Sequence, residues 1–174
     1  MPGPILRAAR ETDLPELVAI YNHYVQNTHI TFDVEPWTVE GRRPWFDEHA
    51  ATGPHRLIVA EEDGAVAGYA TSGEFRRKRA YATSVESTVY VRPESVGRKL
   101  GRALYAELFT VLATEDVHRA YAGIALPNAG SMALHEHFGF RAVGTFQEVG
   151  RKFGKYWDVC WLERPIESMV GLRP

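Results

Sequence analysis

The stretch VESTVYVRPESVGRKLGRALY, residues 85–105, is the most informative segment of the chain, because it predicts a strand, a loop and a helix in succession. β-branched residues dominate its first seven positions, as in a buried strand. Leu100, Leu104 and Leu108 then recur at helical spacing, and an apolar run at 119–126 predicts the next strand. A helix between two strands is typical of a parallel crossover. This half of the chain therefore predicts parallel pairing.

The preceding part of the chain predicts antiparallel pairing. Two apolar runs within residues 56–75 flank Asp63-Gly64, a dipeptide suited to the type I′ turn between twisted antiparallel strands. The other elements follow from hydrophobic periodicity: strands at 5–9, 84–91, 140–149 and 155–164, and helices with apolar positions at 14–25, 39–51, 100–112 and 128–139. Together they predict an α/β fold with a twisted, mixed parallel and antiparallel sheet of about seven strands, flanked by about four helices. No GxGxxG follows the first strand, which argues against a doubly wound dinucleotide-binding fold.

Length, charge and cysteine content exclude several classes of protein. A chain of 174 residues with 45% hydrophobic content predicts a single domain over 1–174, with a tail from about residue 164. Twenty Lys and Arg against 22 Asp and Glu give a net charge of −2, so neither nucleic acid nor an anionic membrane is expected as a partner. The chain shows no signal peptide and no membrane-spanning run, and Cys160 is its only cysteine. We therefore expect a cytoplasmic protein without disulfides or a Cys-rich zinc site.

The loop at residues 96–101 is a candidate phosphate site. A helix N-terminus presents unpaired N–H groups and a partial positive charge, and Gly97 and Gly101 would let a ligand approach the backbone closely. Pyrophosphate would suit such a loop. On spacing alone, an ordinary connecting loop whose glycines serve only the turn is the commoner outcome, so both interpretations stay open.

Glu86 is a candidate general base. Alternation along residues 85–91 places Glu86, Thr88 and Tyr90 on one face of the predicted strand. A carboxylate in so apolar a strand is costly unless it is paired or functional. Glu86 is therefore either a strand-end residue bonded to a nearby Arg, or a base whose pKa is raised by desolvation.

His135 is the second candidate for acid–base chemistry. On the helix predicted at 128–139, Asn128, Ser131 and His135 share one face. A lone helical His is more often a packing residue than a catalyst, so its role stays open. Tyr105 is a weaker candidate for a proton donor and is more simply a core residue. The neighbouring His137 projects from another side of the helix, so the two histidines cannot clamp a metal, and no metal is expected.

Motifs dispersed along the chain accompany the segment at 85–105. In order, they are AIYNHYV (19–25), TFDVEP (31–36), VAGYA (66–70), VESTVYV (85–91), LPN (126–128), LHEHFGF (134–140) and GRKFGKYWDV (150–159). Together they resemble the GNAT superfamily of acetyl-CoA-dependent N-acetyltransferases. More narrowly, the chain resembles the phosphinothricin and methionine sulfone/sulfoximine acetyltransferases from about Ile5 to Glu163.

The resemblance implies a GNAT-like fold and acetyl-CoA as co-substrate. It implies that the strand at 89–91 pairs with the pantetheine arm and that the loop at 96–101 receives the pyrophosphate. The implied cofactor-binding residues are Val89, Tyr90, Val91, Val96, Gly97, Arg98, Lys99, Leu100, Gly101, Asn128 and Ser131.

The loop departs from the usual Q/R-x-x-G-x-G/A pattern. Val96 stands at the Gln/Arg position and Lys99 at the first Gly, whereas Gly101 matches. Backbone N–H groups can still cradle a phosphate if Lys99 adopts the conformation that a glycine allows. The Lys99 ammonium could add a phosphate contact.

The resemblance also implies a mechanism. It places the catalytic Glu at Glu86 and a His at His135, where many members of the wider superfamily carry a Tyr as general acid. The implied reaction is direct: the deprotonated amine attacks the thioester, and a backbone N–H of residues 89–91 polarises the carbonyl. Cys160 lies in an apolar strand and is not expected to act as a nucleophile.

The implied acceptor is a small amino-acid-like amine such as phosphinothricin, methionine sulfoximine or methionine sulfone, and the resemblance implies a homodimer. Within the basic cluster FRRKRAY, residues 75–81, Arg76 or Lys78 could bind the α-carboxylate, although a solvated turn is the simpler interpretation. The candidate substrate-binding residues are Phe32, Arg76, Lys78, Tyr81 and Lys152. Two alternatives remain, acetylation of a peptide N-terminus and a non-catalytic acyl-CoA-binding module.

Overall fold

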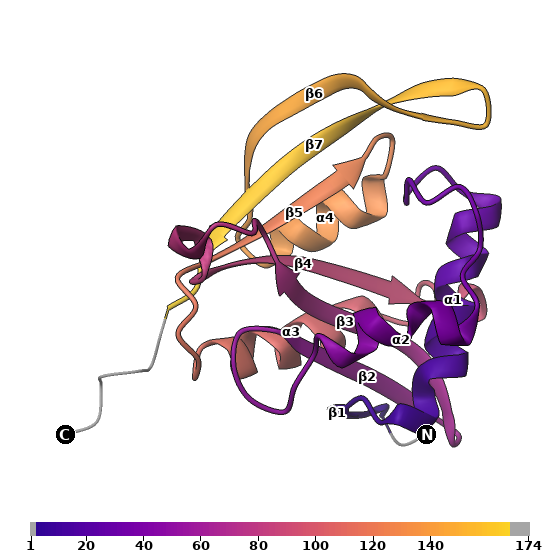
Figure 1. Cartoon of the computed structure of the whole chain (residues 1–174), viewed down its shortest axis with the longest axis vertical. Helices are drawn as coiled ribbons and strands as arrows, with labels where there is room; N and C mark the ends of the chain where they lie inside the picture. Colours follow the sequence, from indigo (N-terminus) through magenta and orange to yellow (C-terminus); the bar gives the residue numbers. More distant parts are fainter. Residues whose placement is uncertain (1–2, 168–174) are drawn as a thin grey trace.

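Seven strands form a mixed sheet in the computed structural model, which describes residues 3–167 (Figure 1). The strands are β1 (Ile5–Ala8), β2 (Arg56–Glu62), β3 (Ala65–Glu74), β4 (Ser84–Val91), β5 (Arg119–Ala125), β6 (Arg141–Lys152) and β7 (Lys155–Pro165). Their order in the sheet is β1-β2-β3-β4-β5-β7-β6. The helices are α1 (Leu14–Asn27), α2 (Val39–Asp47), α3 (Leu100–Leu112) and α4 (Ala129–His137). The predicted α/β fold with a mixed sheet is confirmed.

The pairing follows the two patterns that the sequence predicts. β2 and β3 form an antiparallel hairpin, and Asp63 and Gly64 at its turn both have positive φ, as a type I′ turn requires. β4 and β5 pair in parallel, with α3 as the crossover. Two element boundaries differ from prediction by three residues or more: α2 ends at Asp47 rather than at residue 51, and β6 continues to Lys152 rather than stopping at 149.

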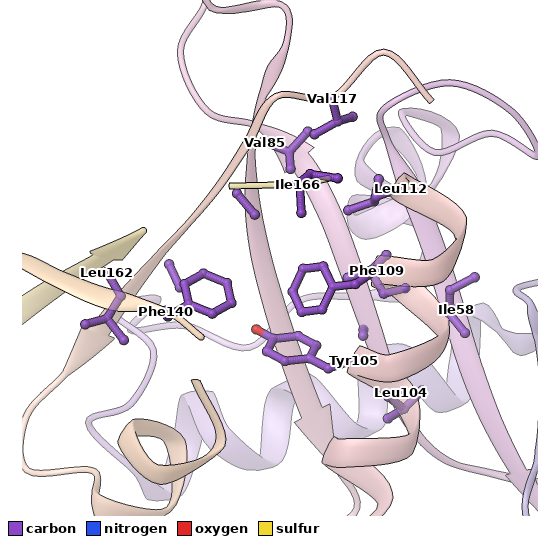
Figure 2. Close-up of a cluster of buried hydrophobic side chains, with 14 of the residues drawn as sticks. Ile58, Val85, Leu104, Tyr105, Phe109, Leu112, Val117, Phe140, Leu162 and Ile166 are labelled. Carbon is purple, nitrogen blue, oxygen red and sulfur yellow. The ribbon is translucent and has the colours of Figure 1, made fainter. Parts of the chain in front are cut away.

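Hydrophobic clusters cover both faces of the sheet. Ile58 of β2 packs in the cluster under α3, whereas Leu57 and Val59 pack in the cluster under α1 and α2. This split follows from the alternation of side chains along a strand. Figure 2 shows Tyr105 and Phe109 projecting from α3 into the larger cluster. Burying both faces holds the centre of the sheet between two layers of helices.

The last strand of the sheet ends within one residue of its predicted boundary. β7 runs to Pro165, and Ile166 is only 6% exposed, with its N–H donating to the carbonyl of His118 at 2.9 Å. The sequence predicts a tail from about residue 164. Residues 168–174 of that tail lie outside the described residues. Between residues 3 and 167, no helix has both the length and the apolar composition needed to cross a bilayer.

An opening between β4 and β5 creates the space for a site. The two strands pair in parallel at only three positions, Ser84↔Arg119, Val85↔Ala120 and Glu86↔Tyr121. β4 nevertheless continues to Val91 and β5 to Ala125, so the strands separate immediately after Glu86. The edge of β4 that faces β5 is consequently free of that pairing over residues 87–91.

Candidate active site

A cavity of about 500 Å³ lies at the separated ends of β4 and β5, and α3 and α4 contribute its walls. All the residues that the sequence predicts for the cofactor line this cavity except Arg98. The Arg98 guanidinium instead pairs with Glu62 at 3.0 Å, and its backbone N–H donates to the carbonyl of Ser95. We call this space the cofactor cavity.

Seven lining residues of the cofactor cavity were not predicted: Tyr24, Ile30, Ser95, Arg102, Gly130, Ala133 and Leu134. Arg102 stands in the first turn of α3, where its place in the basic run at 98–102 could have suggested it. Ser95 lies in the loop before α3. Tyr24 comes from α1, and its hydroxyl donates to the carbonyl of Val91 at the end of β4. No local pattern indicates that last contact, because it joins residues far apart in the chain.

The loop at 96–101 has the conformation that an anion cradle requires. Lys99, the N-cap of α3, has φ 63° and ψ 15°, in the left-handed region that glycine adopts freely. The N–H groups of Lys99, Leu100 and Gly101 have no protein acceptor among residues 3–167. Together with the helix dipole, these three free donors make the N-terminus of α3 suited to bind an anion. The substitution of Lys for Gly at position 99 therefore leaves the backbone geometry intact.

Glu86 lies on the other side of the opening, in a cavity of about 470 Å³ that we call the acceptor cavity. Its carboxylate forms no ion pair among the described residues, which argues against a strand-end Glu bonded to an Arg. Burial raises the pKa of Glu86, and the positive charge of Arg76 partly offsets that rise. A carboxylate with a raised pKa, facing a cavity, is suited to accept a proton from an ammonium group.

His135 is buried, at 3% exposure, and both its ring nitrogens are engaged. Nδ1 lies 2.8 Å from the carbonyl oxygen of Ser131, which can only accept, so Nδ1 carries a proton. Burial lowers the pKa of His135, which favours the neutral ring. Nε2 is then the acceptor for the Tyr105 hydroxyl at 2.9 Å. His135 and Tyr105 both line a small cavity of about 60 Å³ beside residues 87–90.

Comparison with known proteins identifies the family. Residues 6–161 match the acetyltransferase (GNAT) domain family. The chain belongs to the GNAT family of acetyltransferases. It is therefore an enzyme that transfers an acetyl group, and the α/β architecture and the separation of β4 from β5 can be interpreted on that basis.

Individual GNAT relatives narrow the comparison. The chain is 58% identical to the phosphinothricin N-acetyltransferase of Streptomyces coelicolor, over 95% of this chain and 100% of that protein. It is 35% identical to the L-methionine sulfoximine/L-methionine sulfone acetyltransferase of Pseudomonas paraeruginosa, over 93% and 94%. The crystal structure of a GNAT phosphinothricin acetyltransferase from Sinorhizobium meliloti, in complex with acetyl-CoA, superimposes with a TM-score of 0.89. That pair is 29% identical, over 99% of this chain and 94% of the other.

The predicted acceptor residues of this GNAT chain divide into two groups. Phe32 and Arg76 line the acceptor cavity with Glu86. Lys78 and Tyr81 line none of the cavities described above: Lys78 is exposed, and Tyr81 packs its ring against Phe75. The structure therefore favours Arg76 over Lys78 as the cation beside Glu86.

Lys152 has a supporting position rather than a place on the cavity wall. It is 3% exposed, and its Nζ donates to the carbonyl of Thr31 at 2.7 Å. Burial lowers the pKa of Lys152, and Asp33 opposes that shift. The contact holds the loop that carries Phe32 against the β6–β7 hairpin. Within the described residues, no three His, Cys, Asp or Glu side chains form a group that could hold a metal ion.

Replacing Gly150 with Ala should disturb the acceptor cavity selectively. The Phe32 ring packs directly on the Gly150 backbone, and a Cβ at position 150 would overlap that ring. We expect the variant to displace Phe32 and to raise KM for the acceptor about 10-fold, because overpacking of this kind typically costs 1–3 kcal/mol, or about 10-fold per 1.4 kcal/mol. Steady-state kinetics measures the change. Gly144→Ala is the matched control on the same strand, because no atom lies within 4 Å of its added Cβ. Equal effects of the two variants would contradict the prediction.

Proposed function

We propose that this acetyltransferase acts on the amino group of a small amino acid such as phosphinothricin, methionine sulfoximine or methionine sulfone, by direct transfer with Glu86 as general base. The observation that carries the proposal is the place of Glu86 at the last paired position of β4 and β5. Tyr90 and Ile30 line both the cofactor cavity and the acceptor cavity, so the two spaces meet just beyond Glu86. Acetylation of this kind would inactivate toxic amino-acid analogues and so confer resistance to them.

Acetyl-CoA fits the cofactor cavity on two counts. The free N–H groups of Lys99, Leu100 and Gly101 suit the anionic pyrophosphate, and the Lys99 and Arg102 side chains supply positive charge at the same end of the cavity. The unpaired edge of β4 over residues 87–91 offers backbone groups to the pantetheine amides. Both features would bind acetyl-CoA as a co-substrate, and acetyl-CoA would supply the acetyl thioester.

Glu86 removes a proton from the substrate ammonium, directly or through one water, because its raised pKa brings it closer to neutral pH. The amine nitrogen then bonds to the thioester carbonyl carbon, and the carbon–sulfur bond breaks to release the CoA thiolate. A backbone N–H on the free edge of β4 stabilises the negative charge that develops on the carbonyl oxygen. No residue of the chain becomes acetylated in this reaction.

Tyr105 supplies the proton to the thiolate in this proposal. Tyr105 lines the small cavity beside residues 87–90 with an O–H that can be donated, whereas neutral His135 has no proton to give there, because Nδ1–H bonds to the Ser131 carbonyl and Nε2 is an acceptor. Before the reaction His135 accepts from the hydroxyl and holds it at the cavity wall, which makes His135 a positioning residue. When the thiolate forms, the O–H turns from Nε2 of His135 to the sulfur and gives it the proton. We therefore propose Tyr105 rather than His135 as the group that protonates the sulfur.

Replacing Arg76 with Gln should shift the pH dependence of the enzyme. The Arg76 cation lowers the pKa of Glu86, so its removal raises that pKa. Because Glu86 must be deprotonated to act, the acidic limb of the kcat/KM profile should move to higher pH. The KM for acceptors with an α-carboxylate should also rise. Lys78→Gln is the matched control, because Lys78 lies outside the acceptor cavity. An unshifted limb in Arg76→Gln would contradict the prediction.

A substrate panel tests the proposed function. Acetyl-CoA is combined with phosphinothricin, methionine sulfoximine, methionine sulfone and short peptides, and thiol release is measured. We expect release with the free amino acids. Release with the peptides alone would favour N-terminal acetylation of proteins. Calorimetric binding of acetyl-CoA without thiol release would favour a non-catalytic acyl-CoA-binding module, and no binding at millimolar acetyl-CoA would contradict the assignment of the cofactor cavity.

We also propose that the chain forms one domain that acts as a cytoplasmic homodimer. β6 is an edge strand that exposes Val143, at 60%, and Phe146, at 57%. An exposed apolar edge strand is a natural pairing surface for a second copy. Analytical ultracentrifugation tests the dimer. A monomer at micromolar concentration would contradict this part of the proposal.

A further inference from the structure

A second cavity lies beside Glu86, on the side facing α2, and measures about 380 Å³. It shares four lining residues with the acceptor cavity: Tyr21, Glu86, Thr88 and Tyr90. Its remaining walls come mainly from β3 and α2, including Arg42 and Trp45. We call this space the distal lobe. A ligand group bound at Glu86 can therefore extend either into the acceptor cavity or into the distal lobe.

Arg42 is held in the distal lobe by aromatic rings. Its guanidinium carbon lies 4.5 Å from the centre of the Tyr21 ring and 4.4 Å from that of Trp45, with Trp37 at 5.3 Å. Such contacts stabilise the cation through the faces of the rings. Between residues 3 and 167, the guanidinium has no ion pair and no hydrogen bond. Its neighbour Arg43, in contrast, pairs with Glu11 at 2.8 Å. The N–H donors of Arg42 are therefore available to a ligand.

The other charged groups of the distal lobe lie at its rim. Glu48, Glu74 and Arg77 are exposed, whereas Arg42 and Glu86 are half-buried. His49 is held through Nδ1 at 2.9 Å from the carbonyl of Trp45, and burial lowers its pKa, which favours the neutral ring. Inside the lobe, the two charges that a ligand meets away from solvent are thus the Glu86 carboxylate and the Arg42 guanidinium.

We propose that Arg42 is a specificity-determining residue that binds an oxyanion at the far end of the acceptor side chain. The inference rests on the proposed function, in which Glu86 takes the amino group and Arg76 the α-carboxylate. A guanidinium fork matches two oxygens of a phosphinate or carboxylate, and a cation already fixed between rings loses little freedom on binding. A neutral sulfonyl group offers the same oxygens without the charge, so Arg42 favours phosphinothricin over methionine sulfone.

The test compares acceptors that differ at one end. Arg42→Gln should lower kcat/KM for phosphinothricin about 10- to 100-fold, mainly through KM, because a charge-assisted hydrogen bond is lost. The loss for methionine sulfone should be markedly smaller. For 3-aminopropyl(methyl)phosphinic acid, which lacks the α-carboxylate, and at a pH above the acidic limb of both enzymes, Arg42→Gln should still lower kcat/KM, whereas Arg76→Gln should leave it nearly unchanged. Equal losses for phosphinothricin and methionine sulfone, or no loss, would overturn the inference.

Two further variants complete the test. Arg43→Gln is the matched control, because Arg43 pairs with Glu11 and lines none of the cavities. Arg42→Lys keeps a cation between the rings but loses the fork, and should recover part of the phosphinothricin activity. If Arg42→Gln does not fold, Arg42→Lys alone decides: a selective rise in KM for phosphinothricin supports the inference, and an unchanged KM overturns it. A wild-type enzyme that acetylates none of these acceptors would instead refute the proposed function.

Discussion

Replacing Glu86 with Gln should lower kcat by about 10²- to 10⁴-fold, the contribution typical of a positioned general base. Gln has nearly the same shape and keeps the hydrogen-bonding capacity of the side chain, but it cannot accept the ammonium proton. The carboxylate forms no ion pair among the described residues, so its removal breaks no structural contact of that kind. Affinity for acetyl-CoA, measured by calorimetry, should change little because Glu86 does not line the cofactor cavity.

The pH profile provides a second readout for Glu86→Gln. If Glu86 is the base, the acidic limb of kcat/KM that reports its ionisation disappears from the residual activity of the variant. Glu136→Gln is the matched control, since it makes the same substitution at an exposed position of α4 that lines none of the four cavities. Unchanged turnover in Glu86→Gln would remove Glu86 from the mechanism. A parallel loss of acetyl-CoA binding would point to a structural role instead.

Replacing Tyr105 with Phe should affect both catalysis and stability. The hydroxyl is buried and donates to His135, so its removal leaves Nε2 of His135 without a partner and should cost about 1–3 kcal/mol of unfolding free energy. The thiolate also loses its proton donor, so kcat should fall by about 10²-fold or more. Steady-state kinetics and denaturant unfolding measure the two effects separately.

The leaving group distinguishes catalysis from packing in Tyr105→Phe. An acetyl thioester of a more acidic thiol needs less help from a proton donor. With such a thioester, the difference in kcat between Tyr105→Phe and the wild type should therefore be smaller. The exposed Tyr156 provides the matched control, because Tyr156→Phe removes a hydroxyl from a residue that lines none of the three cavities at the β4–β5 opening. A gap that is the same for both thioesters would show that Tyr105 supports the fold without donating the proton.

The sequence was most informative where a feature depends on near neighbours in the chain. The turn at Asp63-Gly64 needs two residues of positive φ, and both are present. The contact between Ser131 and His135 follows from helical spacing, and the structure contains it. Glu86 on the face opposite Val85 follows from strand alternation, and Val85 is indeed buried. Each of these patterns spans only a few residues of the chain, so local backbone geometry suffices to predict it.

The same reasoning failed for side chains whose neighbours come from distant elements. Lys78 and Arg76 are two residues apart in one basic cluster, yet only Arg76 reaches the acceptor cavity. The hydroxyl of Tyr105 meets His135 across 30 positions of sequence. Arg42 has no motif around it, and three aromatic rings from α1, α2 and the loop between them surround it.

The sequence by itself determined the mixed sheet, the crossover at residues 85–105 and the family, because hydrophobic periodicity and the order of the motifs depend on the amino-acid order alone. Only the tertiary structure decided where β4 and β5 part and which cations face the resulting cavities. The physical reason is that a cavity is bounded by elements brought together through burial of their apolar faces. The direction of a side chain is set by its local backbone, whereas the cavity into which it points is formed by several elements of the fold.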